Sequence, residues 1–352
     1  MEGLGVVDRN FWKGRRVFVT GQTGFKGAWL ALWLEQLGAR VTGFSNGVPS
    51  EPSVWKAASV GRSMASVEGD VRDLSALSKE LHDAQPEVVF HLAAQSLVRL
   101  SYDDPAGTFS TNIMGTVNLF EAVRKTASVR AVINITSDKC YENRELDYAY
   151  REGDPMGGRD PYSASKGCAE LVTSAYRQSF FAGSGVGLAS VRAGNVIGGG
   201  DWSADRLVPD CVRAFAAGEQ VIIRNPRSIR PWQHVLEALR GYLLLGQKLS
   251  ADPVTFSHGY NFGPDSQDAQ PVSYVVEKLR AGWGEAAAYR IEQPGEANNP
   301  HEAHFLSLDS TKARTELGWR PRWALDRTLT SIVDWHTTDE RSEEHTSELQ
   351  SH

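Results

Sequence analysis

"VFVTGQTGFKG", residues 17–27, joins an apolar run to a helical pattern through Gly21, Gly24 and Gly27. Glycine at these points allows a tight turn, close approach of the backbone to a pyrophosphate, and close packing of a helix on a strand. The N–H groups and the positive dipole end of the following helix favour a phosphate. An ordinary strand–helix turn is the alternative, but the context on both sides favours a dinucleotide-binding turn.

Short apolar runs alternate with helical patterns through the first half of the chain, which is typical of a parallel sheet covered on both faces. Strands are expected at residues 15–20, 39–44, 66–71, 87–93, 130–136 and 186–192. Helices are expected at residues 25–37, 74–84, 108–127 and 162–181. The predicted fold class is therefore α/β, a Rossmann-type doubly wound parallel sheet with a smaller C-terminal α/β domain for the substrate.

The rhythm changes after about residue 193, where Gly, Pro, Trp and Arg become denser. We expect residues 1–192 to form the dinucleotide-binding domain, with segments at about 229–262 returning to it. Residues 193–335 are expected to form mainly the substrate domain, because loops on a rigid scaffold often carry binding groups. Residues 341–352, "RSEEHTSELQSH", are polar and unpatterned, and we expect them to be a non-native tail.

Composition excludes several classes of protein. A chain of 352 residues with 41% hydrophobic and 23% charged residues can build a sizeable core. A net charge of −6 without a dense basic run predicts no nucleic-acid partner. Cys140, Cys168 and Cys211 are too few and too scattered for a disulfide framework or a metal site, which suits a reducing cytoplasm. No segment has the pattern of a signal peptide or a membrane span.

Tyr162 and Lys166 have a Y-x-x-x-K spacing, which brings both side chains to one face of a helix. A phenol with a pKa near 10 is a poor base at neutral pH, and a neighbouring ammonium is expected to lower that value. The pair is then able to take a proton from a sugar hydroxyl. A surface helix pair is the alternative, but the upstream glycine turn makes the catalytic interpretation more specific.

These features together resemble the extended short-chain dehydrogenase/reductase family up to about residue 335. Supporting stretches are "FSTNIMGTVNLFEA", "RAGNVIGGG", "RPWQHV" and "ELGWRPRW". The resemblance implies NAD as the cofactor and a homodimer or higher homo-oligomer built from the helices at 108–127 and 162–181. Residues expected to contact NAD are Gly21, Thr23, Gly24, Phe25, Lys26, Gly27, Ser45, Asp70, Val71, Leu92, Ala93, Ala94, Thr111, Tyr162 and Lys166.

One feature departs from the family pattern. The second strand of an NAD-binding fold usually ends in an acid that holds the ribose hydroxyls. This chain has "GFSNG" there, with Ser45 and Asn46. Because that acid is absent, the residues alone do not decide between NAD and NADP. NADP is not indicated either, since no Arg lies beside Ser45 and Asn46.

The stretch "NITSDKCYEN" ends an apolar strand with Ser137, Asp138 and Lys139. Burying an acid and a base is costly unless they are paired or used. Family members that remove water place an acid and a base here, and this segment resembles those acting on CDP-glucose. The resemblance implies conversion of CDP-glucose to CDP-4-keto-6-deoxyglucose by a hydro-lyase.

The implied roles follow the chemistry of that reaction. Tyr162 takes the proton of the 4-hydroxyl while NAD takes the hydride from C4, and Ser137 hydrogen-bonds the developing oxyanion. Lys139 removes the C5 proton, which the 4-ketone acidifies. Asp138 protonates the departing 6-hydroxyl, and the hydride returns at C6.

The second half supplies arginines for the substrate diphosphate, since a planar guanidinium binds two oxygens at once. The residues expected to bind substrate are Gln95, Ser96, Asn195, Arg206, Arg224 and Arg230. Trp202 and Trp232 either wall the site or pack in the core, and the sequence leaves both open.

Three alternatives to this reading of the chain are open. Asp138 and Lys139 form an ordinary ion pair in the first. In the second the chain is a nucleotide-sugar 4-epimerase, which has no use for that pair. The third is a sensor or scaffold that keeps the dinucleotide fold without catalysis. His91, His234 and Cys140 are expected to be structural, and no metal is expected.

Overall fold

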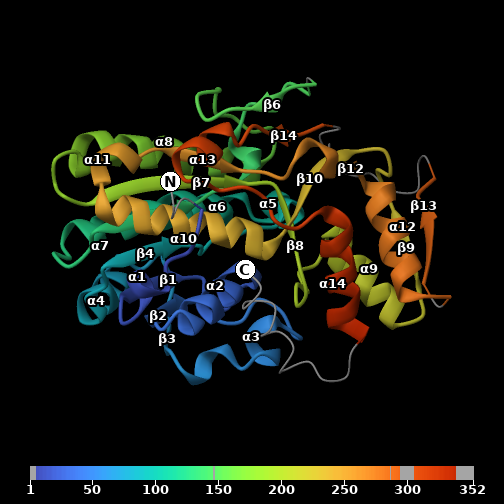
Figure 1. Cartoon of the computed structure of the whole chain (residues 1–352), viewed down its shortest axis with the longest axis horizontal. Coiled ribbons are helices and arrows are strands. Elements are labelled where there is room, and N and C mark those ends of the chain that lie inside the picture. The colour runs from blue at the N-terminus through green and yellow to red at the C-terminus, as the bar shows by residue number, and fades with distance from the viewer. Residues whose placement is uncertain (1–4, 146, 286, 294–304, 338–352) are drawn as a thin grey trace.

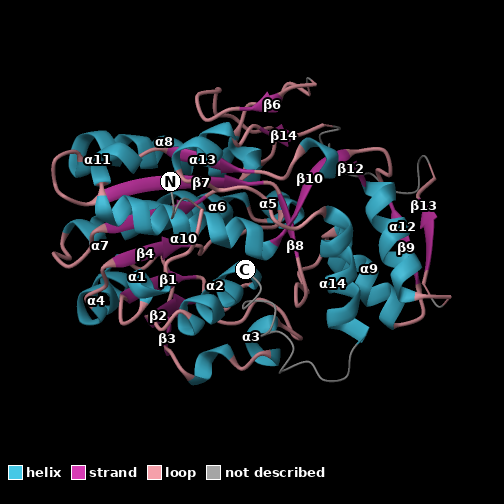
Figure 2. Ribbon diagram, viewed as in Figure 1, coloured by secondary structure: helices cyan, strands magenta, loops and turns pink. Residues whose placement is uncertain are grey.

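A parallel sheet forms the larger part of the molecule (Figures 1 and 2). The computed structural model describes residues 5–145, 147–285, 287–293 and 305–337. Within them, this sheet has seven strands in the order β11-β7-β5-β4-β1-β2-β3, with every neighbouring pair parallel. The strands are β1 (Arg16–Thr20), β2 (Arg40–Ser45), β3 (Ala65–Glu68), β4 (Val88–His91), β5 (Ala131–Ile135), β7 (Gly187–Ala193) and β11 (Gly259–Phe262).

Helices cover both faces of this sheet. One face packs against α2 (Phe25–Gln36) and α10 (Val235–Ala251), and the other against α4 (Leu74–Ala84), α7 (Gly115–Arg124) and α8 (Pro161–Tyr176). Successive strand side chains point to opposite faces, so neighbouring residues of one strand enter different cores. Burial on both faces explains why the strands read as continuous apolar runs.

The smaller part lies at the right of Figure 1 and has its own apolar core. Its strands are β8 (Asn195–Ile197), β10 (Ile229–His234) and β12 (Ala269–Pro271) in one sheet, and β9 (Gln220–Ile223) and β13 (Ala288–Ile291) in another. Its helices are α9 (Leu207–Ala216), α12 (Val272–Trp283) and α14 (Leu325–Thr337). At the top of Figure 1, β6 (Ala149–Tyr150) pairs with β14 (Ser307–Leu308).

Short helices complete the description. The α-helical ones are α1 (Arg9–Trp12), α3 (Val54–Ala57), α5 (Val98–Asp103), α6 (Pro105–Phe109), α11 (Pro253–Phe256) and α13 (Thr311–Glu316). Single 3₁₀ turns are η1 (Val60–Arg62), η3 (Asp138–Cys140) and η5 (Ser266–Asp268), and π turns are η2 (Ser110–Met114) and η4 (Arg177–Phe181). None of the helices in the described part of the chain combines the length and apolar character that crossing a membrane requires.

The predicted fold class is confirmed, and the predicted strands and helices are present with ends shifted by only a few residues. Two features differ from the sequence analysis. Strand β11, which lies within the 229–262 segment, was not among the predicted strands, and it extends the main sheet beyond β7. The helix expected at 108–127 is divided by η2, and the one expected at 162–181 ends in η4.

The division into two domains stays a prediction. Strand β10, at the start of the 229–262 segment, pairs with β8 and β12 in the smaller part, whereas β11 at its end joins the main sheet. The expected tail at 341–352 lies outside the described residues.

Candidate active site

A cavity of about 550 Å³ is lined both by segments that follow strands of the main sheet and by the smaller part. It brings together many of the residues predicted from sequence: Phe25, Lys26, Ser96, Ser137, Asp138, Lys139, Tyr162, Asn195, Arg206, Arg224 and Arg230. In open α/β sheets, ligands bind outside the carboxyl ends of the strands, which is where β5 delivers Ser137, Asp138 and Lys139.

The turn after β5 presents the acid and the base. Ser137 caps η3, with its hydroxyl 3.0 Å from Asp138 Oδ1 and accepting a hydrogen bond from the Lys139 N–H at 3.3 Å. Asp138 is buried, and its Oδ2 has no hydrogen-bond partner among the described residues. Burial raises the pKa of Asp138, against the opposing effects of Lys139 and Ser137. This carboxyl is therefore biased toward the protonated form that a general acid needs.

Tyr162 faces this turn from the first turn of α8. Asp160 caps the helix by accepting a hydrogen bond from the Ser163 N–H at 2.9 Å, and Pro161 occupies the first helical position. Lys139 is half-buried, and its Nζ lies 6.0 Å from the centroid of the Tyr162 ring. Phenol, carboxyl and amine thus share one cavity.

The expected low pKa of Tyr162 is not found. Burial raises the pKa of Tyr162 to about 12, and the hydrogen bond with Ser137 and the charge of Arg206 lower it only in part. Burial and the nearby charge of Lys26 lower the pKa of Lys166 itself to about 7. The Lys166 amine lies 3.4 Å from the carbonyl of Ile135. The expectation that a Lys166 cation lowers the tyrosine pKa is therefore wrong for this structure, because burial disfavours both charges.

The glycine turn has the shape that a pyrophosphate requires. Gly21 has φ +72°, and a Cβ there would lie 2.7 Å from the Ala93 nitrogen. A Cβ on Gly27 would lie 2.0 Å from the Gly21 carbonyl oxygen. Helix α2 begins after Gly24 without a side-chain cap, so its first N–H groups point toward the turn. These residues fit the diphosphate of a dinucleotide.

The residues expected near the adenosine surround the ends of β2 and β3. The Thr23 hydroxyl lies 3.0 Å from the Ser45 hydroxyl, which is buried at the end of β2. Arg72 hydrogen-bonds and pairs with Asp70 at 2.6 Å and lowers the pKa of that carboxyl. Val71 is buried against α7. Their contact with NAD stays a prediction.

Gln95 occupies a different place from the one expected. Its side-chain amide donates to the Leu97 carbonyl at 3.0 Å and to the Thr108 hydroxyl at 2.9 Å, while its N–H donates to Asn112 at 2.8 Å. Gln95 therefore orders the loop after β4 and does not line the cavity. The remaining predicted residues that lie outside the cavity lining are Gly21, Thr23, Gly24, Gly27, Ser45, Asp70, Val71, Leu92, Ala93, Ala94, Thr111 and Lys166.

The arginines expected to bind the diphosphate line the part of the cavity formed by the smaller sheets. Arg206 bridges two loops, donating to the Ser96 hydroxyl at 3.0 Å and pairing with Asp201 at 3.2 Å. Arg224 follows β9, and Arg230 lies on β10. Trp232 lines the cavity, whereas Trp202 lies edge-on to His336, 5.0 Å between ring centroids.

Comparison with known proteins identifies the family. The model of the family described as GDP-mannose 4,6 dehydratase matches residues 18–332. The chain belongs to this family. This result also confirms the predicted membership of the extended short-chain dehydrogenase/reductase family.

The curated relatives include members with different named activities. A "CDP-glucose 4,6-dehydratase" of Salmonella typhimurium is 55% identical over 344 residues, which cover 96% of this chain and 95% of the relative. A "UDP-glucose 4-epimerase" of Mycolicibacterium smegmatis is 26% identical, covering 91% of this chain and 98% of the relative.

Solved structures of proteins with different named activities have the same fold. The dTDP-glucose 4,6-dehydratase of Bacillus anthracis, in complex with NAD, superposes with a TM-score of 0.75 at 20% identity, covering 95% of this chain and 99% of the other. The UDP-glucose 4-epimerase of Thermus thermophilus, in complex with NAD, gives 0.77 at 23% identity, covering 92% and 99%.

The sequence analysis missed several cavity residues: Arg99, Tyr141, Arg159 and Asn225. It also missed Glu170 and Arg192, which form a buried ion pair behind the cavity. The arginine that ends the apolar run "VGLASVR" is a signal of a buried charge that needs a partner, but the sequence does not identify that partner. The structural roles expected for His91 and His234 agree with their contacts, since His91 lies between Thr20 and Thr116 and His234 caps α10.

Gly27→Ala is expected to weaken NAD binding by about 100-fold or more. The added methyl would lie 2.0 Å from the Gly21 oxygen, so the turn has to move. Titration calorimetry with NAD measures the change. Gly153→Ala is the matched control, because no atom lies within 4 Å of the position that its added methyl would take. Equal NAD affinities for the two variants would contradict the proposal that the glycine turn holds the NAD diphosphate.

Asp138→Asn is expected to raise the melting temperature by a few degrees at neutral pH. Burial raises the folded-state pKa of Asp138, so the folded chain binds this proton more tightly than the unfolded chain does. That stabilisation is complete below the unfolded pKa of about 3.9 and is lost as pH rises through the folded pKa. The stability advantage of Asn therefore grows as pH rises above about 4.

Thermal melts between acid and neutral pH measure this difference. Asp103→Asn changes an exposed acid and serves as the control. A melting-temperature difference for Asp138→Asn that stays flat with pH would refute the assignment of a raised pKa.

Proposed function

We propose that this chain is an NAD-dependent hydro-lyase that converts CDP-glucose to CDP-4-keto-6-deoxyglucose. The observation that carries the proposal is that Asp138 and Lys139 line the same cavity as Tyr162. The choice of CDP-glucose is supported by the 55% identical relative named for that reaction. Solved family members in complex with NAD support the choice of cofactor.

Residues 21–27 are proposed to hold the NAD diphosphate, with Tyr162 and Lys166 near the nicotinamide end. When bound, NAD accepts a hydride from C4 of the sugar and returns it to C6, so the reaction consumes no external reductant. The smaller part is proposed to hold the substrate diphosphate through Arg206, Arg224 and Arg230, since guanidinium forks match phosphate oxygens.

Tyr162 is proposed to take the proton of the 4-hydroxyl. The phenol has to release its own proton to water first. Burial raises its pKa and opposes that release, and the Ser137 hydrogen bond and the Arg206 charge lower the pKa in part and favour it. The Ser137 hydroxyl is also proposed to stabilise the charge that develops on O4.

Asp138 and Lys139 are proposed to eliminate water once C4 is a ketone. The ketone acidifies the C5 proton, and the amine of Lys139 removes it and gives it back to C5 when the hydride returns to C6. The C6–O bond breaks as Asp138 gives its proton to the departing hydroxyl, which leaves as water. Burial of Asp138 supports this role, because it favours the protonated carboxyl.

A nucleotide-sugar 4-epimerase is the second candidate, because epimerases are among the relatives and the solved structures with this fold. It would use Tyr162 and Lys166 in the same way. It would give no role to the buried acid and adjacent base, and for that reason we favour the dehydratase.

The cellular location proposed for this reaction is the cytoplasm. Cys140, Cys168 and Cys211 are all free thiols in the structure. Free thiols persist in a reducing compartment, and this supports the proposed location in the cytoplasm.

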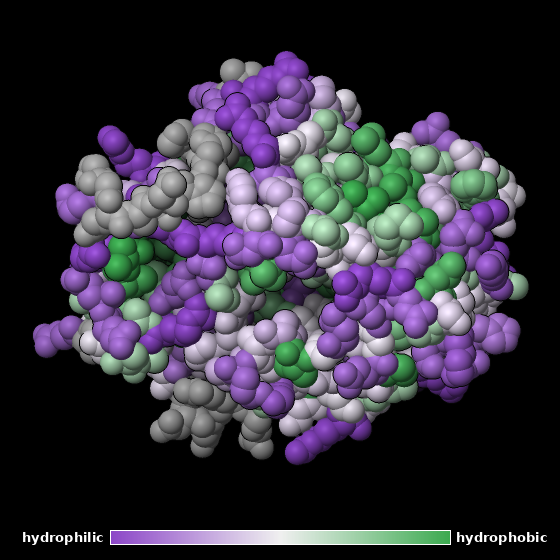
Figure 3. All heavy atoms as spheres, turned by 180° about the vertical axis from the view of Figure 1, so that it is seen from behind, coloured by the Kyte–Doolittle hydropathy of each residue, from purple (hydrophilic) through white to green (hydrophobic). Residues whose placement is uncertain are grey.

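A homodimer is proposed through the faces of η2, α8 and η4. Large apolar side chains are exposed along these elements, with Leu171 60% and Phe180 46% accessible, and Met114 also exposed. Figure 3 shows apolar side chains gathered at the upper right of the rear face, the side of the molecule on which α7 and α8 lie in Figure 1. Exposed apolar patches of this kind mark association surfaces.

The reaction assay separates the candidate functions. With CDP-glucose and NAD, we expect mass spectrometry to show a product lighter by one water. An unchanged mass with a new sugar would indicate an epimerase, and no product at all would favour a binding protein. Lys139→Met is expected to lower kcat by about 100- to 10,000-fold. Lys125→Met, which changes an exposed lysine, is expected to keep the wild-type rate.

Leu171→Glu is expected to convert the dimer to a monomer, because a charge in an apolar interface is desolvated without a partner. Sedimentation velocity measures the mass. Val254→Glu is the control, since Val254 is 82% exposed on α11, away from these helices. A monomeric wild-type chain, or a Leu171→Glu dimer, would contradict the proposed interface.

A further inference from the structure

The turn that carries Ser137, Asp138 and Lys139 is held weakly by its own hydrogen bonds. The N–H of Cys140 donates to the Ser137 carbonyl at 3.2 Å, and that of Tyr141 to the Asp138 carbonyl at 3.4 Å. Both distances are at or beyond the long end for N–H···O bonds. A single 3₁₀ turn has poor hydrogen-bond geometry in general. The position of the acid and base therefore depends on contacts from outside the turn.

Upstream of the turn, Thr136 provides one such contact. Its hydroxyl donates to Glu170 Oε1 at 2.5 Å, and its N–H donates to the Val191 carbonyl at 2.9 Å. Glu170 lies on α8 one helical turn after Lys166, and Val191 lies on β7. The residue just before Ser137 is thus tied to the helix that carries Tyr162.

Downstream of the turn, Tyr141 provides a second contact, in addition to the hydrogen bond that the Gly157 N–H donates to the Cys140 carbonyl at 2.8 Å. Its hydroxyl accepts a hydrogen bond from Arg192 Nη1 at 2.6 Å and donates to Asn261 Oδ1 at 2.7 Å. The Arg192 guanidinium also lies 5.0 Å from the centroid of the Tyr141 ring. The residue just after Cys140 is thus tied to β7 and β11.

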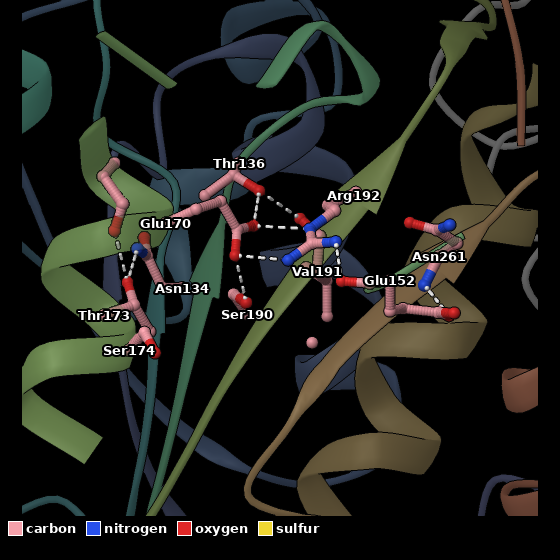
Figure 4. A network of polar contacts seen from close by, with 12 residues as sticks. Asn134, Thr136, Glu152, Glu170, Thr173, Ser174, Ser190, Val191, Arg192 and Asn261 are labelled. Atoms are coloured by element: carbon pink, nitrogen blue, oxygen red, sulfur yellow. Dashed lines mark hydrogen bonds and ion pairs between the residues drawn. The ribbon is translucent and has the colours of Figure 1, made fainter. Parts of the chain in front are cut away.

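A buried ion pair joins these two contacts. Figure 4 shows the Glu170 and Arg192 side chains of this pair facing one another, with Thr136 and Ser190 beside Glu170. Arg192 binds Glu170 with both arms of its fork, Nε to Oε1 at 2.9 Å and Nη2 to Oε2 at 2.8 Å. The two side chains are only 6% and 4% exposed, and Ser190 adds a further hydrogen bond to Oε2. Such bidentate, charge-assisted pairs fix geometry as well as charge.

Helix α8 also packs directly against the turn. A Cβ on Gly167, next to Lys166, would lie 3.2 Å from the Cys140 carbonyl oxygen. Helix α8 and the turn are therefore in direct contact. A shift of one relative to the other would also break the hydrogen bonds of Thr136 and Tyr141.

We propose that the Glu170–Arg192 pair is a positioning device which, through Thr136 and Tyr141, sets the distance of Asp138 and Lys139 from Tyr162. Neither member of the pair lines the cavity, so both act through other residues. The inference rests on the proposed function in one respect, because it assigns to the pair the positioning of the two groups that eliminate water. C4 oxidation depends mainly on Tyr162, which lies on α8 and not on the turn.

Thr136→Val and Tyr141→Phe test the proposal, because each removes one hydroxyl and leaves the ion pair in place. Misplacement of catalytic groups by a fraction of an ångström to 1 Å is expected to lower kcat by about 10- to 100-fold with KM nearly unchanged. The kinetic isotope effect with substrate deuterated at C5 is expected to rise and that with substrate deuterated at C4 to fall, since elimination then limits the rate. The double variant is expected to lose less than the product of the single losses.

Two matched variants control for the loss of a buried hydroxyl. Thr126→Val removes one that bonds the Ala122 carbonyl, and Tyr260→Phe removes one that bonds Glu316, both away from the turn. Their kcat and isotope effects are expected to remain those of the wild type. Glu170→Gln is a poorer test than either hydroxyl variant, because breaking a buried pair threatens folding itself.

Hydrogen–deuterium exchange provides a readout independent of activity. The amides of residues 138–141 are expected to exchange about tenfold faster in Thr136→Val and Tyr141→Phe, but not in the controls. Faster exchange in a chain that does not dehydrate CDP-glucose would overturn the proposed function and keep the positioning role. Unchanged exchange, or a dehydratase whose isotope effects stay at wild-type values in both variants, would overturn the positioning role.

Discussion

An acid and a base stand at the buried end of strand β5, and the buried polar groups next to them have to be paired with one another. Glu170 provides most of this pairing. Its carboxylate accepts four hydrogen bonds, from Thr136, Ser190 and two arms of Arg192. Burial favours a neutral carboxyl, but the Arg192 charge and these donors hold the pKa of Glu170 below its ordinary value. A fixed negative charge thereby joins β5, β7 and α8 immediately behind the cavity.

In contrast, several titratable groups in the cavity or close to it are left without such compensation. Asp138 keeps one carboxylate oxygen unpaired among the described residues, and burial raises its pKa. Burial likewise lowers the pKa of Lys166 to about 7 and that of Lys26 to about 8. Buried groups with shifted pKa values, such as these, are typical of functional sites and come at the expense of stability. The hydrogen-bonded ion pair that Thr136 contacts is thus separated by a single residue along the chain from the reactive groups that begin at Ser137.

Local patterns explain how much of this arrangement could be predicted from the sequence. Gly21 and Gly27 follow from a strand–helix turn that only glycine fits, and Tyr162 with Lys166 follows from helical spacing. Ser137, Asp138 and Lys139 were expected at the site because an acid and a base end a buried apolar strand, and because the family resemblance implies a role for them. What failed was set by tertiary burial: the pKa of Tyr162 depends on how completely α8 is covered, and Gln95 is engaged by its own loop. The pairing of Glu170 with Arg192 needs the register of α8 on β7, which no local pattern contains.

Strand β11 has a consequence for how the chain is made. It is the only neighbour of β7 on that side of the main sheet among the described residues, yet it follows β7 only after β8, α9, β9, β10, α10 and α11. During synthesis on a ribosome, β7 therefore exposes a row of unpaired backbone groups until residue 262 has emerged. Such an open edge is a template for pairing with the wrong chain. The N-terminal half cannot finish its own sheet, and a truncated product ending before residue 259 would carry an edge prone to aggregation.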